Sequence, residues 1–228
     1  MQKRLIRKLD LEILLSKVEP LSKPSTELEQ YAVSTETAAT MLYLAAYMHD
    51  NVLNKKVVDL GCGTGRLALG AAFLGAREVV GIDIDKHSIK RASENSIKVL
   101  QKKKVQWIIS DIESIRGHFD TVLQNPPFGV QKRGADRKFI VKALQLGSVV
   151  YSLHKRPDHD SELVKKLKST GDGILQVAGT GFMNNLVEEN GGIVDSVYAL
   201  LMTIPHMFPF HTEKRHEFVV DLYVLRKK

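Results

Sequence analysis

The chain contains very little cysteine. Its 228 residues include one cysteine, Cys62, and one tryptophan. A single cysteine excludes an intrachain disulfide, so we expect a reducing, cytoplasmic compartment. Cys62 lies inside a glycine-rich turn, where we expect it as a small residue that a tight turn tolerates rather than as a nucleophile.

Long apolar runs are also absent. The longest late tract, 193–202, contains Asp195 and is followed by Pro205, so it is too short to span a bilayer. The basic segment 1–8 is not followed by the apolar region of a signal peptide. Helical spacing predicts instead an N-terminal amphipathic helix packed on the domain, with the apolar positions Leu5, Leu9, Ile13 and Leu14. Its basic face could also contact RNA.

Positive charge, by contrast, is in excess. The chain has 33 Lys and Arg against 26 Asp and Glu, a net charge of +7 and a pI near 9.4. This balance favours a polyanionic partner, although many basic proteins bind no nucleic acid. The length and the 43% hydrophobic content fit one α/β domain over 1–228. The histidines His206, His211 and His216 lack the spacing of a zinc site, so we expect no metal.

The tetrapeptide Asn125-Pro126-Pro127-Phe128 follows the apolar run 119–123. The amine of adenine and the amide of glutamine are poor nucleophiles because their lone pairs are delocalised. An Asn oxygen and the carbonyl of the next proline can each accept one N–H and so aim the lone pair at an electrophile. The prolines stiffen this segment, and Phe128 offers a ring on which a base can stack. An ordinary Pro-Pro turn with a buried Phe is the alternative.

A glycine-rich turn lies upstream. Residues 55–60 read as a strand, Gly61-Cys62-Gly63-Thr64-Gly65 as a turn, and 66–74 as a helix, which is the form of a nucleotide site. A nicotinamide-binding unit is the rival interpretation. Two features oppose it: Arg66 stands where that fingerprint has Gly or Ala, and Asp59 would repel a pyrophosphate. A ligand with a cationic amino group suits Asp59 better.

Polar residues follow four predicted strands at their carboxyl ends. These residues are Asp59, Asp83, Asp111 and Asn125. In an open α/β sheet such ends lie along one ligand-binding edge, although surface carboxylates and caps could produce the same pattern. S-adenosylmethionine fits these groups.

The apolar runs predict a seven-stranded, mostly parallel sheet with helices on both faces and an antiparallel last strand. The strands are expected at 55–60, 78–83, 105–109, 119–123, 149–153, 193–203 and 217–225. Helices are expected at 35–48, 66–74 and 136–147, and a solvated helix within 155–168.

Several segments together resemble a known family. They are Leu28-Glu29-Gln30-Tyr31, Met41-Leu42-Tyr43, 59–65, 81–85, 119–122 with 125–129, Val150-Tyr151-Ser152-Leu153-His154-Lys155 and Val220-Asp221-Leu222. Over nearly its whole length the chain resembles class I S-adenosylmethionine-dependent methyltransferases with a Rossmann-like fold. Within them it resembles the archaeal and eukaryotic small-subunit ribosomal RNA adenine-N6 methyltransferases, whose eukaryotic members work with a small zinc-binding activator subunit. Val79, Val80 and Ile82 are candidate edge residues for such a subunit, or core residues of the sheet.

The resemblance implies roles for individual residues. Residues 1–50 would be a helical extension and cofactor-closing segment on a core of 51–228. The implied cofactor-binding residues are Gln30, Tyr31, Val33, Asp59, Gly61, Gly63, Thr64, Arg66, Asp83 for the ribose, and Asp111 with Ile112 for the adenine. Asn125, Pro126, Pro127 and Phe128 would be catalytic. Ala32-Val33 stand where the family commonly has Pro-Thr, and 171–181 resembles an insertion.

Two segments are candidates for contact with RNA. Lys132 and Arg133 follow the tetrapeptide, and Phe208, Phe210 and His211 combine aromatic rings with nearby cations. A solvated loop and a cap on the sheet are the respective alternatives. We therefore expect adenine-N6 methylation of structured RNA, most simply ribosomal. The rivals are N5-glutamine methylation of a translation factor and a non-catalytic, cofactor-binding RNA scaffold.

Overall fold

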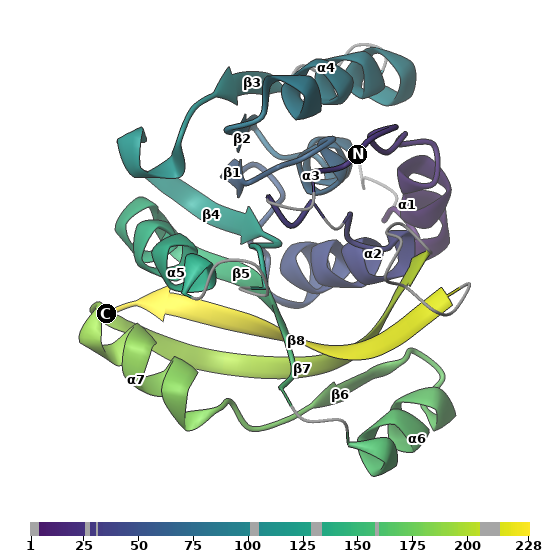
Figure 1. Cartoon of the computed structure of the whole chain (residues 1–228), viewed down its shortest axis with the longest axis vertical. Helices are drawn as coiled ribbons and strands as arrows, with labels where there is room; N and C mark the ends of the chain where they lie inside the picture. The colour runs from purple at the N-terminus through teal and green to yellow at the C-terminus, as the bar shows by residue number, and fades with distance from the viewer. Residues whose placement is uncertain are drawn as a thin grey trace.

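The chain forms one eight-stranded sheet in a computed structural model that describes residues 5–25, 28–30, 32–100, 105–128, 134–157, 160–205 and 215–228. The strand order is β3-β2-β1-β4-β5-β8-β7-β6 (Figure 1). The strands are β1 (Lys56–Leu60), β2 (Glu78–Asp83), β3 (Gln106–Ile109), β4 (Phe119–Gln124), β5 (Gly147–Lys155), β6 (Ile174–Gln176), β7 (Gly192–Pro205) and β8 (Arg215–Lys227).

The first five strands are parallel, and the last three are added antiparallel. β8 pairs with β5, β7 with β8, and β6 with β7, each in antiparallel register. The α/β class with an antiparallel C-terminal part is confirmed, but the expected count of seven strands is wrong. The eighth strand, β6, lies in the segment 171–181 that resembles an insertion. With three residues it is too short to show alternation in the sequence.

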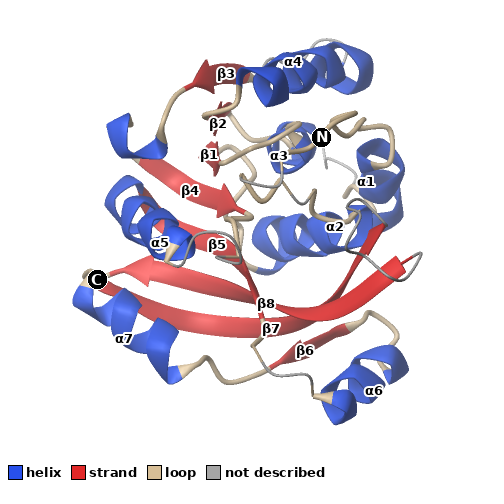
Figure 2. Cartoon of the chain, viewed as in Figure 1, coloured by secondary structure: helices blue, strands red, loops and turns tan. Residues whose placement is uncertain are grey.

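Helices cover both faces of the sheet (Figure 2). They are α1 (Lys8–Leu15), α2 (Thr35–Tyr43), the π-helical turn η1 (Leu44–Met48), α3 (Arg66–Leu74), α4 (Lys86–Leu100), the 3-10 turn η2 (Ile112–Ser114), α5 (Ala135–Leu146), α6 (Ser161–Ser169) and α7 (Gly181–Glu189). One core cluster joins α1, α2 and α3 to the sheet, and a second joins α5 and α7 to the opposite face. None of the helices in the described ranges is long and apolar enough to cross a membrane.

The N-terminal helix is present but is rotated relative to the expectation. Leu11, Leu14 and Leu15 are its buried residues. Of the four apolar positions predicted to pack inward, only Leu14 does, whereas Leu5, Leu9 and Ile13 are exposed. The stretch 5–15 has apolar residues on more than one side, so spacing alone does not identify the side that faces α2 and α3.

The parallel strands form because their sequences are continuous apolar runs, as expected for strands covered on both faces. β1 and β2 contain Val57, Val58, Val79, Val80 and Ile82, all of them buried. The last three are therefore core residues and not edge residues, because β2 lies between β1 and β3. The edge of this half of the sheet is β3, on which Ile108 and Ile109 are exposed.

Candidate active site

A cavity of about 360 Å³ opens at the carboxyl ends of β1, β2 and β4. Its size lies within the range of ordinary small-molecule sites. Most residues that the sequence assigned to a cofactor or catalytic role line it: Gln30, Val33, Asp59, Gly61, Gly63, Thr64, Arg66, Asp83, Asp111, Ile112, Asn125 and Pro127. Side chains from distant parts of the chain thus meet at the predicted edge of the sheet.

The glycine turn is shaped by backbone angles that side chains disfavour. Gly61, Gly63 and Gly65 have φ of +67°, +53° and +89°, and Gly65 is the N-cap of α3. A Cβ on Gly61 would meet the ring of Phe139 at 3.0 Å, so this ring packs directly on the turn. Thr64, Arg66 and Leu67, at the junction of the turn and α3, line the cavity, and the first N–H groups of a helix are available to a ligand.

The carboxylates of buried Asp59 and half-buried Asp83 fix the turn and the start of α3. Asp83 Oδ2 accepts a hydrogen bond from the Gly63 N–H at 2.8 Å, and Asp59 Oδ2 accepts one from the Ala68 N–H at 2.9 Å. Burial raises the pKa of both carboxyls, that of Asp59 to about 7. A cationic ligand group would favour the ionised forms. Burial also raises the pKa of the Cys62 thiol, which agrees with a structural rather than a nucleophilic cysteine.

Asp111 and Ile112, which follow β3 in the chain, form one wall of the cavity. Asp111 caps η2, because its Oδ1 accepts a hydrogen bond from the Glu113 N–H at 2.9 Å. Ile112 is 8% exposed and presents its apolar surface to the cavity. An apolar side chain beside a capped turn suits a flat, partly polar ring such as adenine.

The other wall is the segment between α1 and α2. We call residues 18–33 the strap; 18–25, 28–30 and 32–33 are described. The strap residues that line the cavity are Pro20, Leu21, Pro24, Leu28, Glu29, Gln30, Ala32 and Val33. No sequence signal indicates a role for Pro20, Leu21 and Pro24, since a proline-containing polar stretch is also typical of a solvated connection.

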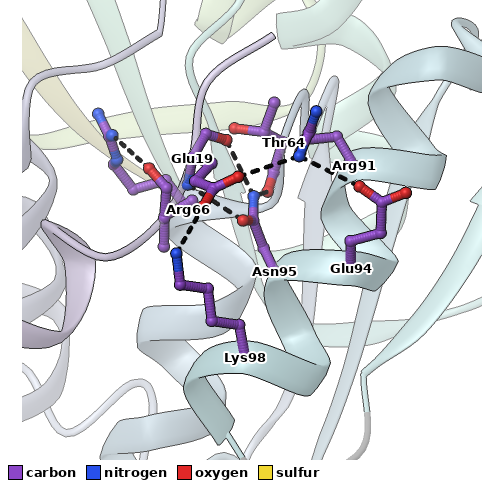
Figure 3. Close-up of polar contacts among 8 residues, drawn as sticks. Glu19, Thr64, Arg66, Arg91, Glu94, Asn95 and Lys98 are labelled. Atoms are coloured by element: carbon purple, nitrogen blue, oxygen red, sulfur yellow. Dashed lines mark hydrogen bonds and ion pairs between the residues drawn. The ribbon is translucent and has the colours of Figure 1, made fainter.

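The strap is fixed to the glycine turn and to α4 at one end (Figure 3). Asn95 of α4, only 2% exposed, accepts from the Glu19 N–H at 3.0 Å and donates to the Glu19 carbonyl at 3.0 Å. The same Nδ2 donates to the carbonyl of Thr64 at 3.1 Å. The Glu19 carboxylate adds ion pairs with Arg91 and Lys98.

Arg66 joins both ends of the strap to the start of α3. Its guanidinium donates to the carbonyls of Val18 and Val33. The resemblance implied that Arg66 binds the cofactor, and the structure adds this side-chain function. Gln30 is likewise engaged, because its Nε2 donates to Asp85 Oδ2 at 2.9 Å and to Ser88 Oγ at 3.3 Å.

The Asn-Pro-Pro-Phe segment begins where β4 ends. Asn125 and Pro127 line the cavity, Pro126 is buried, and Phe128 packs against the core beside Phe218. The Phe128 and Phe218 rings meet edge to face, with centroids 6.0 Å apart. The amide of Asn125 therefore shares one cavity with the glycine turn and the two carboxylates.

Further cavity residues have no recognisable signal in the sequence. Ser88, Ser110, Gly134, Ala135, Lys138 and Phe139 also line it. They belong to α4, α5 and connecting loops, and only the fold brings them to this edge. The remaining predicted site residues, Tyr31, Lys132, Arg133, Phe208, Phe210 and His211, lie outside the described residues.

The donors and acceptors of the cavity fit S-adenosylmethionine. The carboxylates of Asp59 and Asp83 suit its cationic amino group and its ribose hydroxyls, and the start of α3 offers N–H groups. The comparisons with known proteins agree. Residues 34–148 match the family described as "Methyltransferase small domain". A Caenorhabditis elegans relative, "rRNA N(6)-adenosine-methyltransferase metl-5", is 31% identical over 94% of this chain and 95% of its own. The chain belongs to the rRNA N6-adenosine-methyltransferase family.

Other relatives and a crystal structure support this assignment. The Danio rerio "rRNA N(6)-adenosine-methyltransferase METTL5" is 38% identical over 66% of this chain and 75% of its own. The crystal structure of PH1948 from Pyrococcus horikoshii, a candidate RNA methyltransferase, matches with a TM-score of 0.80 and 33% identity over 98% of this chain and 99% of that one. A Methanocaldococcus jannaschii relative named for N5-glutamine methylation covers only 53% of this chain. The chain is thus an S-adenosylmethionine-dependent methyltransferase.

Proposed function

We propose that the protein transfers a methyl group from S-adenosylmethionine to N6 of adenosine in ribosomal RNA. One observation carries the proposal: Asn125 lines the same cavity as Asp59, Asp83 and the glycine turn. A group that can orient an amine therefore lies beside the groups that suit the cofactor. The names of the relatives support adenosine as the methylated base.

At the cofactor, each residue has a proposed task. The buried carboxylate of Asp59 favours the cationic amino group, and Asp83 accepts hydrogen bonds from the ribose. Asp111 and Ile112 hold the adenine. Gln30, Val33 and Tyr31 close the strap over the ligand, while Gly61, Gly63, Thr64 and Arg66 shape the turn.

At the target base, the residues after β4 orient the nucleophile. When bound, S-adenosylmethionine supplies an electrophilic methyl group on its sulfonium. The Asn125 side-chain oxygen and the Pro126 carbonyl each accept one N–H of the adenine amine, which directs the lone pair at that carbon. Pro127 stiffens the segment, and Phe128 stacks on the base. The methylated nitrogen is cationic and then loses one proton to water, so no strong general base is needed.

Methyl transfer to RNA with and without Asn125 tests the proposal. The substrate is total ribosomal RNA, the donor is tritiated S-adenosylmethionine, and digestion to nucleosides identifies the product. We expect label in N6-methyladenosine from the wild type, a loss of about 100-fold or more in kcat for Asn125→Ala, and unchanged cofactor affinity. Asn184→Ala on α7, an exposed asparagine outside the cavity, is the matched control. Label in protein but not in RNA would indicate glutamine methylation instead.

The proposal includes a surface for the RNA. Lys132 and Arg133, together with Phe208, Phe210 and His211, would contact the backbone and bases around the target adenosine. The double variant Lys132→Ala/Arg133→Ala should raise KM for RNA several-fold at unchanged cofactor affinity. An unchanged KM would remove this pair from the substrate surface.

We also propose that a small zinc-binding activator subunit pairs with the edge strand β3. Ile108 and Ile109 are 38% and 58% exposed there, on a strand whose outer side is unpaired within the described sheet. The isolated chain should then be weakly active, and Ile109→Lys should weaken the complex. A monomeric, fully active preparation would contradict this part of the proposal. The single cysteine supports a cytoplasmic site of action.

A further inference from the structure

A row of buried polar side chains lies behind the Asn-Pro-Pro-Phe segment, on the α5 side of the sheet. Gln124 is the last residue of β4, Ser152 is its register partner in β5, and His154 follows two residues later. Gln124 and Ser152 are fully buried, and His154 is 8% exposed. Gln124 Nε2 donates to Ser152 Oγ at 2.9 Å, and that oxygen lies 2.7 Å from His154 Nε2.

The direction of the bond between Ser152 and His154 depends on the tautomer of the imidazole. Ser152 Oγ accepts from Gln124, so its own proton is available to donate to His154 Nε2. Assigned in this way, the imidazole carries its proton on Nδ1. Burial lowers the pKa of His154 to about 4, so the ring is neutral near pH 7. Its Nδ1 lies 4.0 Å from Asp136 Oδ2, which is therefore a contact of a neutral ring with a carboxylate and not an ion pair.

This row touches both ends of the segment that contains the catalytic residues. Gln124 immediately precedes Asn125, and Asp136 is the second residue of α5, which begins directly after Gly134. His154 lies between these two ends. Its ring is held by Tyr223, which is 1% exposed and meets it edge to face at 5.6 Å and 87°.

A core built only for stability would not place polar groups here. Val122 and Val150, two residues earlier on the same face of the same strands, are apolar and fully buried. In the row, Gln124 Oε1 is buried and accepts no hydrogen bond from any described residue. Leaving such a group unsatisfied costs about 1–3 kcal/mol. A row of buried polar side chains that lowers stability and lies beside the active site indicates that the site requires a fixed geometry.

We propose that His154 is a positioning residue, which acts through Ser152 and Gln124 to hold Asn125 in the orientation that methyl transfer requires. Asn125 directly follows Gln124 and lines the cavity, so fixing the Gln124 side chain toward α5 restricts the backbone that carries Asn125. A displacement of about 1 Å at a reacting group can cost about 100-fold in rate. The inference rests on the proposed function, because that function gives Asn125 its task.

Substitutions that remove or restore one bond test the row. Ser152→Ala removes the link and should lower kcat for ribosomal RNA by about 10- to 100-fold, with the Kd for S-adenosylhomocysteine within about twofold of wild type. His154→Gln places an amide near the position of Nε2 and should retain much of the activity. The amide of His154→Asn ends near Nδ1, so this variant should lose activity as Ser152→Ala does.

The control is a second Ser–His pair at the other end of the same strands. Ser148 Oγ lies 3.2 Å from His118 Nε2, both residues are exposed, and Ser148 also belongs to β5. Ser148→Ala should leave kcat unchanged. A Ser152→Ala enzyme with wild-type kcat would overturn the inference, as would a loss of kcat matched by an equal loss of cofactor affinity.

A measurement without turnover separates this inference from the proposed function. Hydrogen–deuterium exchange of the peptide around 123–128 should become about tenfold faster in Ser152→Ala and His154→Asn, and should be unchanged in Ser148→Ala. Unchanged exchange in all three variants would refute the positioning role of His154. If the wild type transfers no methyl group to RNA but the exchange responds as expected, the proposed substrate is wrong, whereas the row from Gln124 to His154 still holds the segment that contains Asn125.

Discussion

Replacing Asn95 by alanine should detach the strap from the cofactor cavity. The Asn95 side chain makes three hydrogen bonds, two to the backbone of Glu19 and one to the Thr64 carbonyl. Alanine removes all three. The ion pairs of Glu19 with Arg91 and Lys98 would remain, but their side chains are about one third to one half exposed. Such pairs contribute at most about 1 kcal/mol each and would not hold the strap alone.

The expected loss of affinity follows from the two strap bonds. Each contributes about 1 kcal/mol net, so ordering the strap over the ligand becomes less favourable by about 2 kcal/mol. At about 1.4 kcal/mol per factor of ten, the Kd for S-adenosylhomocysteine should rise about 30-fold.

Calorimetric titration of S-adenosylhomocysteine measures this effect directly. The matched control is Glu94→Ala, the preceding residue on α4, which makes only a half-exposed ion pair with Arg91 at 3.2 Å. Its Kd should stay within about twofold of wild type. If Asn95→Ala binds as tightly as Glu94→Ala, the strap is not held by Asn95 and its assignment as a wall of the site is wrong.

Three further predictions concern the glycine turn, the carboxylate of Asp59 and the ring beside the Asn-Pro-Pro-Phe segment. Gly65→Ala should lower the free energy of unfolding by about 2 kcal/mol or more, since φ is +89° and the new Cβ would meet Trp107 at 2.5 Å. Gly63→Ala, with open space, should cost about 1 kcal/mol in the same denaturant titration. Burial raises the pKa of Asp59 to about 7, above its unfolded value, so stability should fall as pH rises toward 7 and Asp59→Asn should reduce that slope. Phe218→Ala should raise KM for RNA several-fold, because it removes the ring beside Phe128, and an unchanged KM would contradict this.

The same titration of Asp59 should affect cofactor binding with the opposite trend. The ionised carboxylate attracts a cationic amino group, so affinity for S-adenosylmethionine should increase as pH rises through about 7. Asp59→Asn should flatten this dependence. Equal pH profiles for the two proteins would show that Asp59 does not contact the charged part of the ligand.

Local sequence signals are enough to predict the half of the fold that holds the cofactor. Helix 66–74 and strand 78–83 have the bounds that the sequence predicts. Continuous apolar runs, a glycine turn and a helical pattern each depend on neighbouring residues, and parallel strands necessarily end at one edge. For that reason the sequence alone assigns Asp59, Asp83, Asp111 and Asn125 to one site.

Contacts between distant elements decide which other side chains complete that site. Glu19 and Asn95 are 76 residues apart, and neither belongs to a motif. The three-residue strand β6, the inward side of α1 and the row from Gln124 to His154 likewise depend on packing between elements. Periodicity shows which residues of one helix or strand are apolar. Which residues of another element cover them, or form hydrogen bonds with them, is set only when the elements pack together.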